Sequence, residues 1–260
     1  MDKKYFFFDI DGTLTSCKEH GMVPEDTREA IRKAKQAGHF IALATGRSYT
    51  MAKQFALDLG IDHLVCNGGN DLYIHHECLR HRSLDHSLCL EVIAECKEKQ
   101  LPFCIASEDS YIRYTHNESF LDVVPEQRFL GKLEVVKDID YEAIPHYERI
   151  MIGIQEGEEQ KLDVFQRHHL PMRYNPYYCI LEPDHKDDGI KDMMQLMQQP
   201  MDNVVVFGDS RNDIRMFRIA PTSIAMGNAI DEVKALASYV TASSDDGGII
   251  KALMHFGWIA

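Results

Sequence analysis

The sequence predicts an α/β fold, with a Rossmann-like doubly wound parallel sheet as its core and an inserted α+β domain. Three observations indicate this class. An apolar run near the N-terminus is typical of a strand buried on both faces. Strand and helix patterns then alternate at both ends of the chain, as βαβ units require. Between these ends the pattern changes, which indicates an insertion.

Residues 1–82 are expected to form the first part of the core. The predicted first strand runs from Lys4 to Phe8 and ends at Asp9. A helix from Pro24 to Ala37 should follow, because Pro is favoured early in a helix and Gly38 lies just past its end. The next predicted elements are a strand from Phe40 to Ala44, a helix from about Ser48 to Leu59, and a strand from Leu64 to Cys66.

Residues 83–183 are expected to form the inserted α+β domain. Two pairs of strand-like segments carry this prediction, and a helical stretch precedes each pair. The segments are a helix over 85–99 before strands 103–106 and 112–115, and a helix over 158–168 before strands 172–174 and 178–181. No Ser/Gly-rich linker marks the edges of the insertion.

Residues 184–260 return to the alternation of the first part and are expected to complete the core. The predicted elements are a helix over about 188–198, strand 204–207, helix 212–219, strand 223–225 and helix 231–237. The two end segments therefore belong to one sheet in this prediction.

Composition narrows the class of protein. The chain has 260 residues, of which 45% are hydrophobic and 27% are charged, as in an ordered globular protein. Its seven cysteines form no C-x-x-C pair, so a disulfide framework or a zinc site is not expected. The net charge of −13 argues against a nucleic-acid partner.

The N-terminal apolar run is too short for a signal peptide, and no segment reaches the roughly 18 apolar residues of a membrane span. We therefore expect a cytoplasmic protein without a membrane partner. The sequence leaves the oligomeric state open.

Carboxylates follow two of the predicted strands. Asp9 and Asp11 lie at positions i and i+2 after the first strand, and Asp209 follows the strand over 204–207. Carboxyl ends of parallel strands meet at one edge of a sheet, where α/β proteins bind ligands. Closely spaced carboxylates repel each other unless a proton or a cation intervenes. An oxygen-rich site for Mg²⁺ is therefore expected, with Asp213 nearby.

A phosphate site is expected beside this metal site. Thr45 ends a predicted strand, and Gly46 allows backbone N–H groups to approach a phosphate before the next helix begins. Lys186 and Asn212 belong to two further segments that stand out in the sequence. Each segment alone has an ordinary explanation, such as a helix cap or a solvated charge. Their ordered occurrence at strand ends favours a functional site.

These segments resemble those of haloacid dehalogenase superfamily phosphatases over essentially the whole chain, and the insertion after the third strand resembles the Cof-like branch with a type IIB cap. The resemblance implies that Asp9 is the nucleophile and Asp11 the general acid and base. It implies Mg²⁺ ligation by Asp9, the Asp11 carbonyl and Asp209. Asn67-Gly68 also resembles a short signature of the family.

The resemblance assigns further roles, among them phosphate binding to Asn212 and the remaining positive charge to Lys186. Thr45 matches the phosphate-binding threonine of the second motif, and Asp213 matches the second acid of the fourth motif. Lys186 matches the lysine of the third motif in a Lys-x-x-Gly-Ile variant, with Lys191 as the alternative. Arg47 is expected either to contact the substrate or to pair with a neighbouring carboxylate.

The resemblance to the Cof-like branch implies that the substrate is a small phosphorylated metabolite, such as a sugar phosphate or a phosphorylated cofactor. The alternatives are a phosphosugar mutase and a non-catalytic module that binds phosphate or metal. Adjacent histidines at 75–76 and 168–169 are not expected to bind metal, since neighbouring side chains point in different directions. Tyr174, Tyr177 and Tyr178 are expected to pack at a hairpin tip.

Overall fold

The computed structural model of this protein describes residues 2–19, 21–125, 131–168 and 172–260. Within them the chain forms two compact units. The core unit comprises residues 1–81 with 184–260, and the inserted unit comprises Arg82–Pro183. The chain thus leaves the core unit once and returns to it once.

The core unit contains a mostly parallel sheet with the order β14-β13-β12-β1-β2-β3-β4-β5 among the described residues. Strands β14 to β3 pair in parallel, whereas β4 and β5 are antiparallel. The strands are β1 (Tyr5–Phe8), β2 (Phe40–Ala44), β3 (His63–Cys66), β4 (Asp71–Ile74), β5 (Glu77–Arg80), β12 (Val204–Gly208), β13 (Thr222–Ala225) and β14 (Tyr239–Val240). The predicted doubly wound parallel sheet is confirmed.

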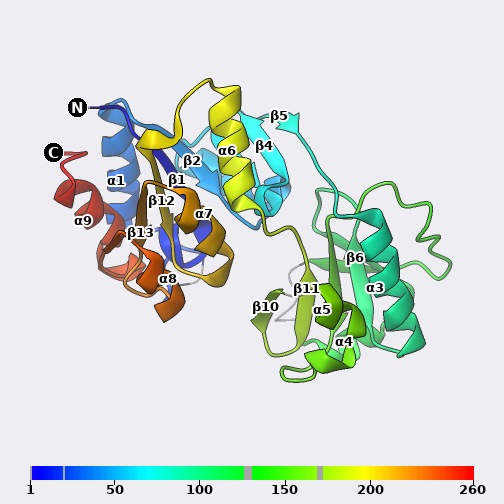
Figure 1. Cartoon of the computed structure of the whole chain (residues 1–260). Coiled ribbons are helices and arrows are strands. Elements are labelled where there is room, and N and C mark those ends of the chain that lie inside the picture. Colours follow the sequence, from blue (N-terminus) through cyan, green and yellow to red (C-terminus); the bar gives the residue numbers. More distant parts are fainter. Residues whose placement is uncertain (1, 20, 126–130, 169–171) are drawn as a thin grey trace. The chain divides into compact units, whose positions relative to one another are not determined.

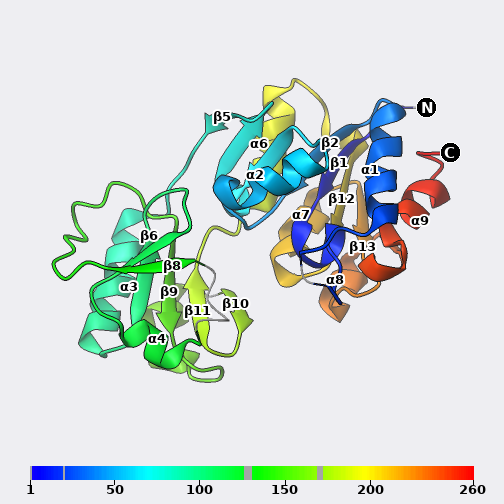
Figure 2. The same ribbon diagram turned by 180° about the vertical axis from the view of Figure 1, so that it is seen from behind.

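Helices cover both faces of this sheet (Figures 1 and 2). One face packs against α1 (Glu25–Gln36), α2 (Tyr49–Asp58) and α9 (Gly248–His255). The other packs against α6 (Lys186–Leu196), α7 (Ile214–Ile219) and α8 (Asp231–Leu236). In β1, Phe6 and Phe8 point to the first face, whereas Tyr5 and Phe7 point to the second. This alternation explains the continuous apolar run, because both sides of the strand are buried.

The inserted unit contains a second sheet with the order β10-β11-β9-β6-β7-β8. Its strands are β6 (Phe103–Ala106), β7 (Ile112–Thr115), β8 (Lys132–Val135), β9 (Arg149–Gly153), β10 (Met172–Asn175) and β11 (Tyr178–Leu181). Helices α3 (His86–Glu98) and α5 (Asp163–His168) pack on one face, and α4 (Ser119–Val123) packs on the other. This arrangement is an α+β fold.

Several elements differ from the sequence prediction. In place of the helix expected over 158–168, the chain forms a 3₁₀ turn, Glu159–Lys161, and then α5. Leu162, which joins the two, interrupts the helix because its backbone is extended and its side chain is buried. The helix expected from residue 212 begins at Ile214, after a 3₁₀ turn over Arg211–Asp213. Conversely, α6 begins earlier than expected, at Lys186. Strands β4, β5, β8, β9 and β14 and helices α4 and α9 were not predicted.

No helix among the described residues is both long enough and apolar enough to span a bilayer.

Candidate active site

Two carboxylates lie at adjacent strand ends in the centre of the core sheet. Asp9 follows β1 and Asp209 follows β12, and these strands pair in parallel with Phe8 opposite Phe207. The backbone N–H of Asp9 donates to the carbonyl of Phe207 at 3.0 Å. From β1 the chain order proceeds to β2 and β3 on one side and to β12 and β13 on the other. This is the switch point of a doubly wound sheet, where such folds bind ligands.

A buried lysine joins the acidic residues. The Lys186 ammonium donates to Asp9 Oδ1 and to Asp213 Oδ1, each at 2.7 Å, and its side chain is 0% exposed. Burial alone would lower the pKa of Lys186, but the carboxylates of Asp213 and Asp9 outweigh burial and raise it above the ordinary value. Lys186 therefore remains a permanent cation in the site. Lys191, the alternative, is half-exposed and pairs with Asp187 and Asp188 on the same helix.

Two glycines allow the start of α6 to approach the sheet. A Cβ on Gly69 would overlap the carbonyl of His185, and a Cβ on Gly189 would overlap the side chain of Val65. The N–H of His185 donates to the carbonyl of Gly68 at 2.6 Å. These contacts give the Lys-x-x-Gly spacing a physical meaning, since residues i and i+3 share one helix face. They also bring the Asn67-Gly68 segment into contact with His185, the residue that precedes Lys186.

The turn after β12 is built around Asp213. Its Oδ2 accepts from the N–H groups of Asp209 and Ser210 at 2.9 and 3.0 Å, while Oδ1 accepts from Lys186. Because both oxygens of Asp213 already accept hydrogen bonds, this residue supports the turn. Asp209 instead faces the loop after β1, where its Oδ1 accepts from the Thr13 hydroxyl at 2.9 Å.

Two of the predicted phosphate residues, Thr45 and Gly46, lie directly after β2. Thr45 is buried, and its hydroxyl accepts from the N–H of Arg47 at 3.1 Å. A Cβ on Gly46 would stand 3.7 Å from Asn212 Nδ2, so these two residues are neighbours. Thr45 and Gly46 follow β2 whereas Asn212 lies in the turn after β12, so residues from two strand ends come together here.

Arg47 forms an ion pair with Asp11. Its Nε and Nη2 donate to Asp11 Oδ2 and Oδ1 at 2.9 and 2.6 Å. The Asp11 side chain is 64% exposed, whereas Asp9 is buried. Of the two roles expected for Arg47, the structure shows the pairing with a neighbouring carboxylate.

The buried acids suit a metal ion. Asp9, Asp209 and Asp213 each offer a carboxylate oxygen, and these atoms lie within 4.8 Å of one another. Burial raises the pKa of Asp9 well above its ordinary value, with Lys186 opposing the rise and Asp213 and Asp209 adding to it. Burial and Asp213 likewise raise the pKa of Asp209 to about 7. Such crowding of carboxylates favours a second cation, and oxygen ligands fit a hard divalent ion.

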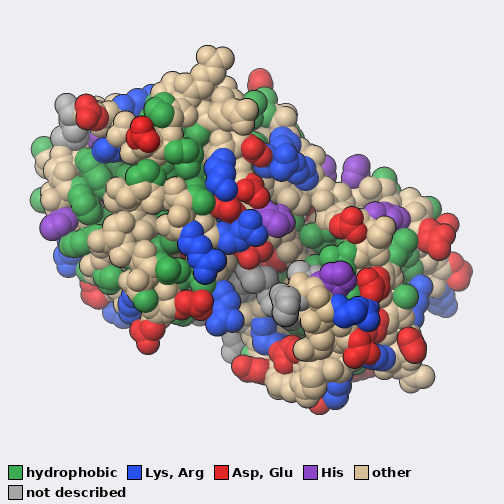
Figure 3. Space-filling view, viewed as in Figure 1, with side chains coloured by type: hydrophobic (Ala, Val, Ile, Leu, Met, Phe, Trp, Pro, Cys, Tyr) green, Lys and Arg blue, Asp and Glu red, His purple; other side chains and the backbone are tan. Residues whose placement is uncertain are grey.

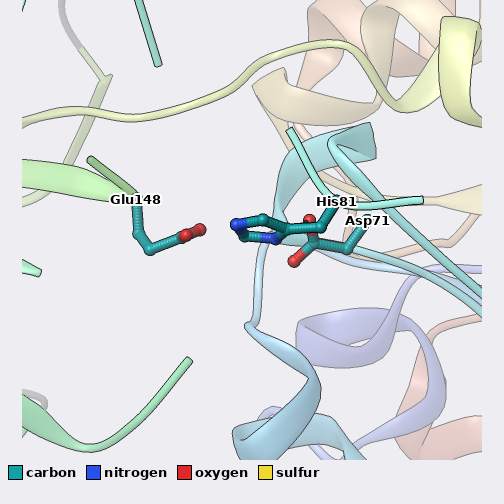
Figure 4. Close-up of side chains that lie close together, drawn as sticks. All are labelled: Asp71, His81 and Glu148. Atoms are coloured by element: carbon teal, nitrogen blue, oxygen red, sulfur yellow. Dashed lines mark hydrogen bonds and ion pairs between the residues drawn. The ribbon is translucent and has the colours of Figure 1, made fainter. Parts of the chain in front are cut away.

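A further acid–histidine pair lies elsewhere in the core unit. Asp71 Oδ1 lies 2.8 Å from His81 Nδ1. Figure 4 shows the two side chains next to each other. Glu148, the third side chain in that view, belongs to the inserted unit. We assign this pair no role in the site around Asp9.

Other polar and aromatic residues singled out in the sequence have these surroundings. His75 and His76 form the turn between β4 and β5, both with positive φ. His168 ends α5 and His169 lies outside the described residues. Tyr178 is buried and Tyr177 packs against the same cluster, as expected, while the side chain of Tyr174 lies outside the described part.

Arginines of the turn after β12 and of α7 line a hollow of about 510 Å³. Arg215 Nε lies 2.8 Å from Asp187 Oδ1, and Arg211 lies 3.6 Å from Glu232. Figure 3 shows this mixture of basic and acidic side chains on the face that carries α7. The ion pairs balance charge locally, and we assign the hollow no phosphate-binding role.

Sequence reasoning missed two contacts of the loop after β1. It assigned no role to the Thr13 hydroxyl, which contacts Asp209, or to Asn228, which contacts the backbone of Gly12 at 2.8 Å. Asn228 stands shortly after β13, at the same edge of the sheet as Asp209. The strand-end rule that found Asp209 could therefore have found it.

Comparisons with known proteins find similar sequences along nearly the whole chain. Residues 6–253 match the sequence model of a family described as haloacid dehalogenase-like hydrolase. "Putative phosphatase YkrA" of Bacillus subtilis is 27% identical, with 99% of each chain covered. The B. subtilis protein named 5-amino-6-(5-phospho-D-ribitylamino)uracil phosphatase YcsE is 24% identical, covering 98% of this chain and 96% of its own.

A solved structure extends the similarity to three dimensions. The structure described as the HAD subclass IIB sugar phosphatase BT4131 superposes with a TM-score of 0.79 at 29% identity. The match covers 99% of this chain and 100% of the other. It therefore includes both the core unit and the inserted unit.

Proposed function

Because this chain belongs to the haloacid dehalogenase-like hydrolases and is a phosphoric monoester hydrolase, we propose that it hydrolyses small phosphorylated metabolites. The reaction proceeds through an aspartyl-phosphate on Asp9, and Mg²⁺ is the cofactor. The observation that carries the proposal is the position of Asp9. Its carboxylate stands at the switch point, held by Lys186 at 2.7 Å beside Asp209. A nucleophile, a permanent cation and a metal-binding oxygen thus meet at one point.

Asp9 attacks phosphorus in line and forms the covalent intermediate. Asp11 protonates the departing alcohol, and then removes a proton from the water that hydrolyses the intermediate. The structure separates these two carboxylates by environment, since Asp9 is buried whereas Asp11 is mostly exposed. Arg47 holds the Asp11 carboxylate through two hydrogen bonds and so limits its rotation.

The phosphoryl oxygens are negatively charged and need positive partners or N–H donors. Lys186 provides a charge that burial does not remove, and Thr45, Gly46 and Asn212 provide hydroxyl, backbone and amide groups. Asp9, Asp209 and the Asp11 carbonyl would hold Mg²⁺. When bound, the ion neutralises charge on the phosphoryl group and on the attacking carboxylate.

The substrate class follows from what the similar proteins are said to act on. One is named as a phosphatase of a phosphoribityl compound and another as a sugar phosphatase. Both names indicate phosphomonoesters of polyhydroxylated small molecules. We propose the same class for this enzyme.

The test compares the wild type with Asp9→Asn. Asparagine keeps the shape of the side chain and an oxygen that can accept from Lys186, but it is a poor nucleophile. We expect Mg²⁺-dependent release of inorganic phosphate from a panel of sugar phosphates in the wild type, and none in the variant. Full activity of Asp9→Asn would exclude the proposed nucleophile.

Two further measurements complete this test. Removal of divalent ions by a chelator should abolish phosphate release, and added Mg²⁺ should restore it. Analysis of the organic product separates hydrolysis, which yields a free alcohol, from a mutase reaction, which yields an isomeric sugar phosphate.

A further inference from the structure

Asn228 connects the loop after β1 to the C-terminal part of the core unit. Its Nδ2 donates to the carbonyl of Gly12 at 2.8 Å, and its Oδ1 accepts from the N–H of Ser244 at 2.9 Å. The residue after Ser244 also contacts the loop after β1, because the Ser16 hydroxyl donates to the carboxylate of Asp245. The side chain of Asn228 thus has both polar ends engaged.

The hydrogen bonds of Gly12 determine the direction of two peptide groups. Its N–H donates to Thr15 Oγ1 at 3.1 Å, so the carbonyl of Asp11, on the same planar trans peptide, points the opposite way. Its carbonyl accepts from Asn228, so the N–H of Thr13 points away from Asn228 for the same reason. Asn228 therefore sets the direction of the Gly12–Thr13 peptide.

This peptide needs such a contact. Gly12 has φ of +82°, and a Cβ there would overlap the carboxylate of Asp209, so only glycine fits. Glycine offers little resistance to rotation of the peptides beside it. Rotation of the Gly12–Thr13 peptide would move Thr13, whose hydroxyl donates to Asp209 at 2.9 Å.

We propose that Asn228 is a positioning residue for this reaction: by holding the Gly12 carbonyl it fixes the Gly12–Thr13 peptide and so keeps the Thr13 hydroxyl on Asp209. The inference rests on the proposed function. Asn228 acts through Gly12 and Thr13, and it needs no contact with substrate.

Two substitutions separate the two ends of the side chain. Asn228→Ala removes both hydrogen bonds. Asn228→Asp has the same shape and keeps an acceptor for Ser244, but it cannot donate to Gly12 when ionised. The matched control is Asn203→Asp, because Asn203 accepts from Lys4 at 2.7 Å just before β12 begins, at the opposite end of that strand from Asp209.

We expect both Asn228 variants to lower kcat by about 10- to 100-fold, as small displacements of reacting groups do, with much less change in KM. The control should match the wild type. A loss shared by the neutral and the charged variant excludes a simple effect of the added charge. Wild-type kcat in both variants would overturn the inference, as would a loss that appears only with aspartate.

A measurement that needs no catalysis tests the positioning role of Asn228 separately from the proposed function. In the metal-free protein, the backbone ¹H–¹⁵N resonances of Gly12 and Thr13 should shift in both Asn228 variants and not in the control. Unshifted resonances would contradict the inference even if activity falls. If the wild type releases no phosphate, the proposed function fails, whereas the resonances still report whether Asn228 directs the peptide.

Discussion

Substitution of Lys186 by methionine tests how the acidic site is kept folded. Lys186 is fully buried, with its ammonium 2.7 Å from both Asp9 and Asp213. At that distance, and with an effective dielectric constant of about 20, each attraction is about 6 kcal/mol. Desolvation of the buried ions costs several kcal/mol each and offsets much of this gain. Removal of one partner nevertheless leaves buried charge uncompensated, which costs about 3–5 kcal/mol.

Trp258 provides the assay. It is the single tryptophan of the chain, it is buried in the core unit, and its ring lies 5.2 Å from that of Phe6. Its fluorescence therefore follows unfolding of the core unit rather than of the inserted unit. With an m value of roughly 2 kcal/mol/M, Lys186→Met should lower the urea midpoint by about 2 M. Phosphate release should fall in the same variant.

Lys191→Met is the matched control, since it makes the same change on the same helix. Lys191 is half-exposed and its ion pairs are worth less than about 1 kcal/mol. A double variant, Lys186→Met with Asp213→Asn, should regain part of the lost stability, because one of the unpaired charges is removed. Equal midpoints for Lys186→Met and Lys191→Met would refute the reasoning.

Three further outcomes are expected. Gly12→Ala should abolish activity, because the new Cβ would overlap the carboxylate of Asp209 after β12. Gly21→Ala is the control and should keep activity, because Gly21 has a similar φ of +80° but open space around it. Equal losses in the two variants would contradict this. Arg47→Met should lower kcat, since it frees the carboxylate of Asp11 to rotate, and an unchanged kcat would exclude that role. Burial lowers the pKa of His63 to about 4. Between about pH 4 and 6.5 the unfolded chain therefore binds a proton at this residue that the folded chain does not bind. Stability should therefore fall as pH decreases through this window, and His63→Gln should reduce that slope in urea titrations.

The sequence predicted the core well because its strands are buried on both faces. Continuous apolar runs such as Phe40–Ala44 are easily recognised, and their bounds agree with the structure. The prediction missed β9, although Arg149–Gly153 is fully buried. This strand pairs with β6 and β11, which lie far away on either side in the chain, so local periodicity says nothing of its central place.

The contacts between residues of the site were harder to predict than the residues themselves. Strand ends identified Asp9 and Asp209 because topology alone brings them together. The contact between Lys186 and Asp9 spans 177 positions, and it depends on glycines that let α6 approach the sheet. The bond from Asn228 to Gly12 spans 216 positions. Such contacts follow from packing between elements, which no short segment encodes.

The arrangement of acids that we propose for catalysis opposes folding. Burial of Asp9, Asp209 and Asp213 at one sheet edge places like charges in a poorly hydrated region, and the raised pKa values of Asp9 and Asp209 express that cost. Lys186 offsets it permanently, whereas a metal ion can do so only while bound. If Mg²⁺ is the second cation, it should raise the urea midpoint followed by Trp258 fluorescence. The gain should be smaller in Asp209→Asn, which keeps the side-chain shape but removes one charged oxygen ligand. A midpoint that Mg²⁺ leaves unchanged would show that the acidic cluster does not bind this ion.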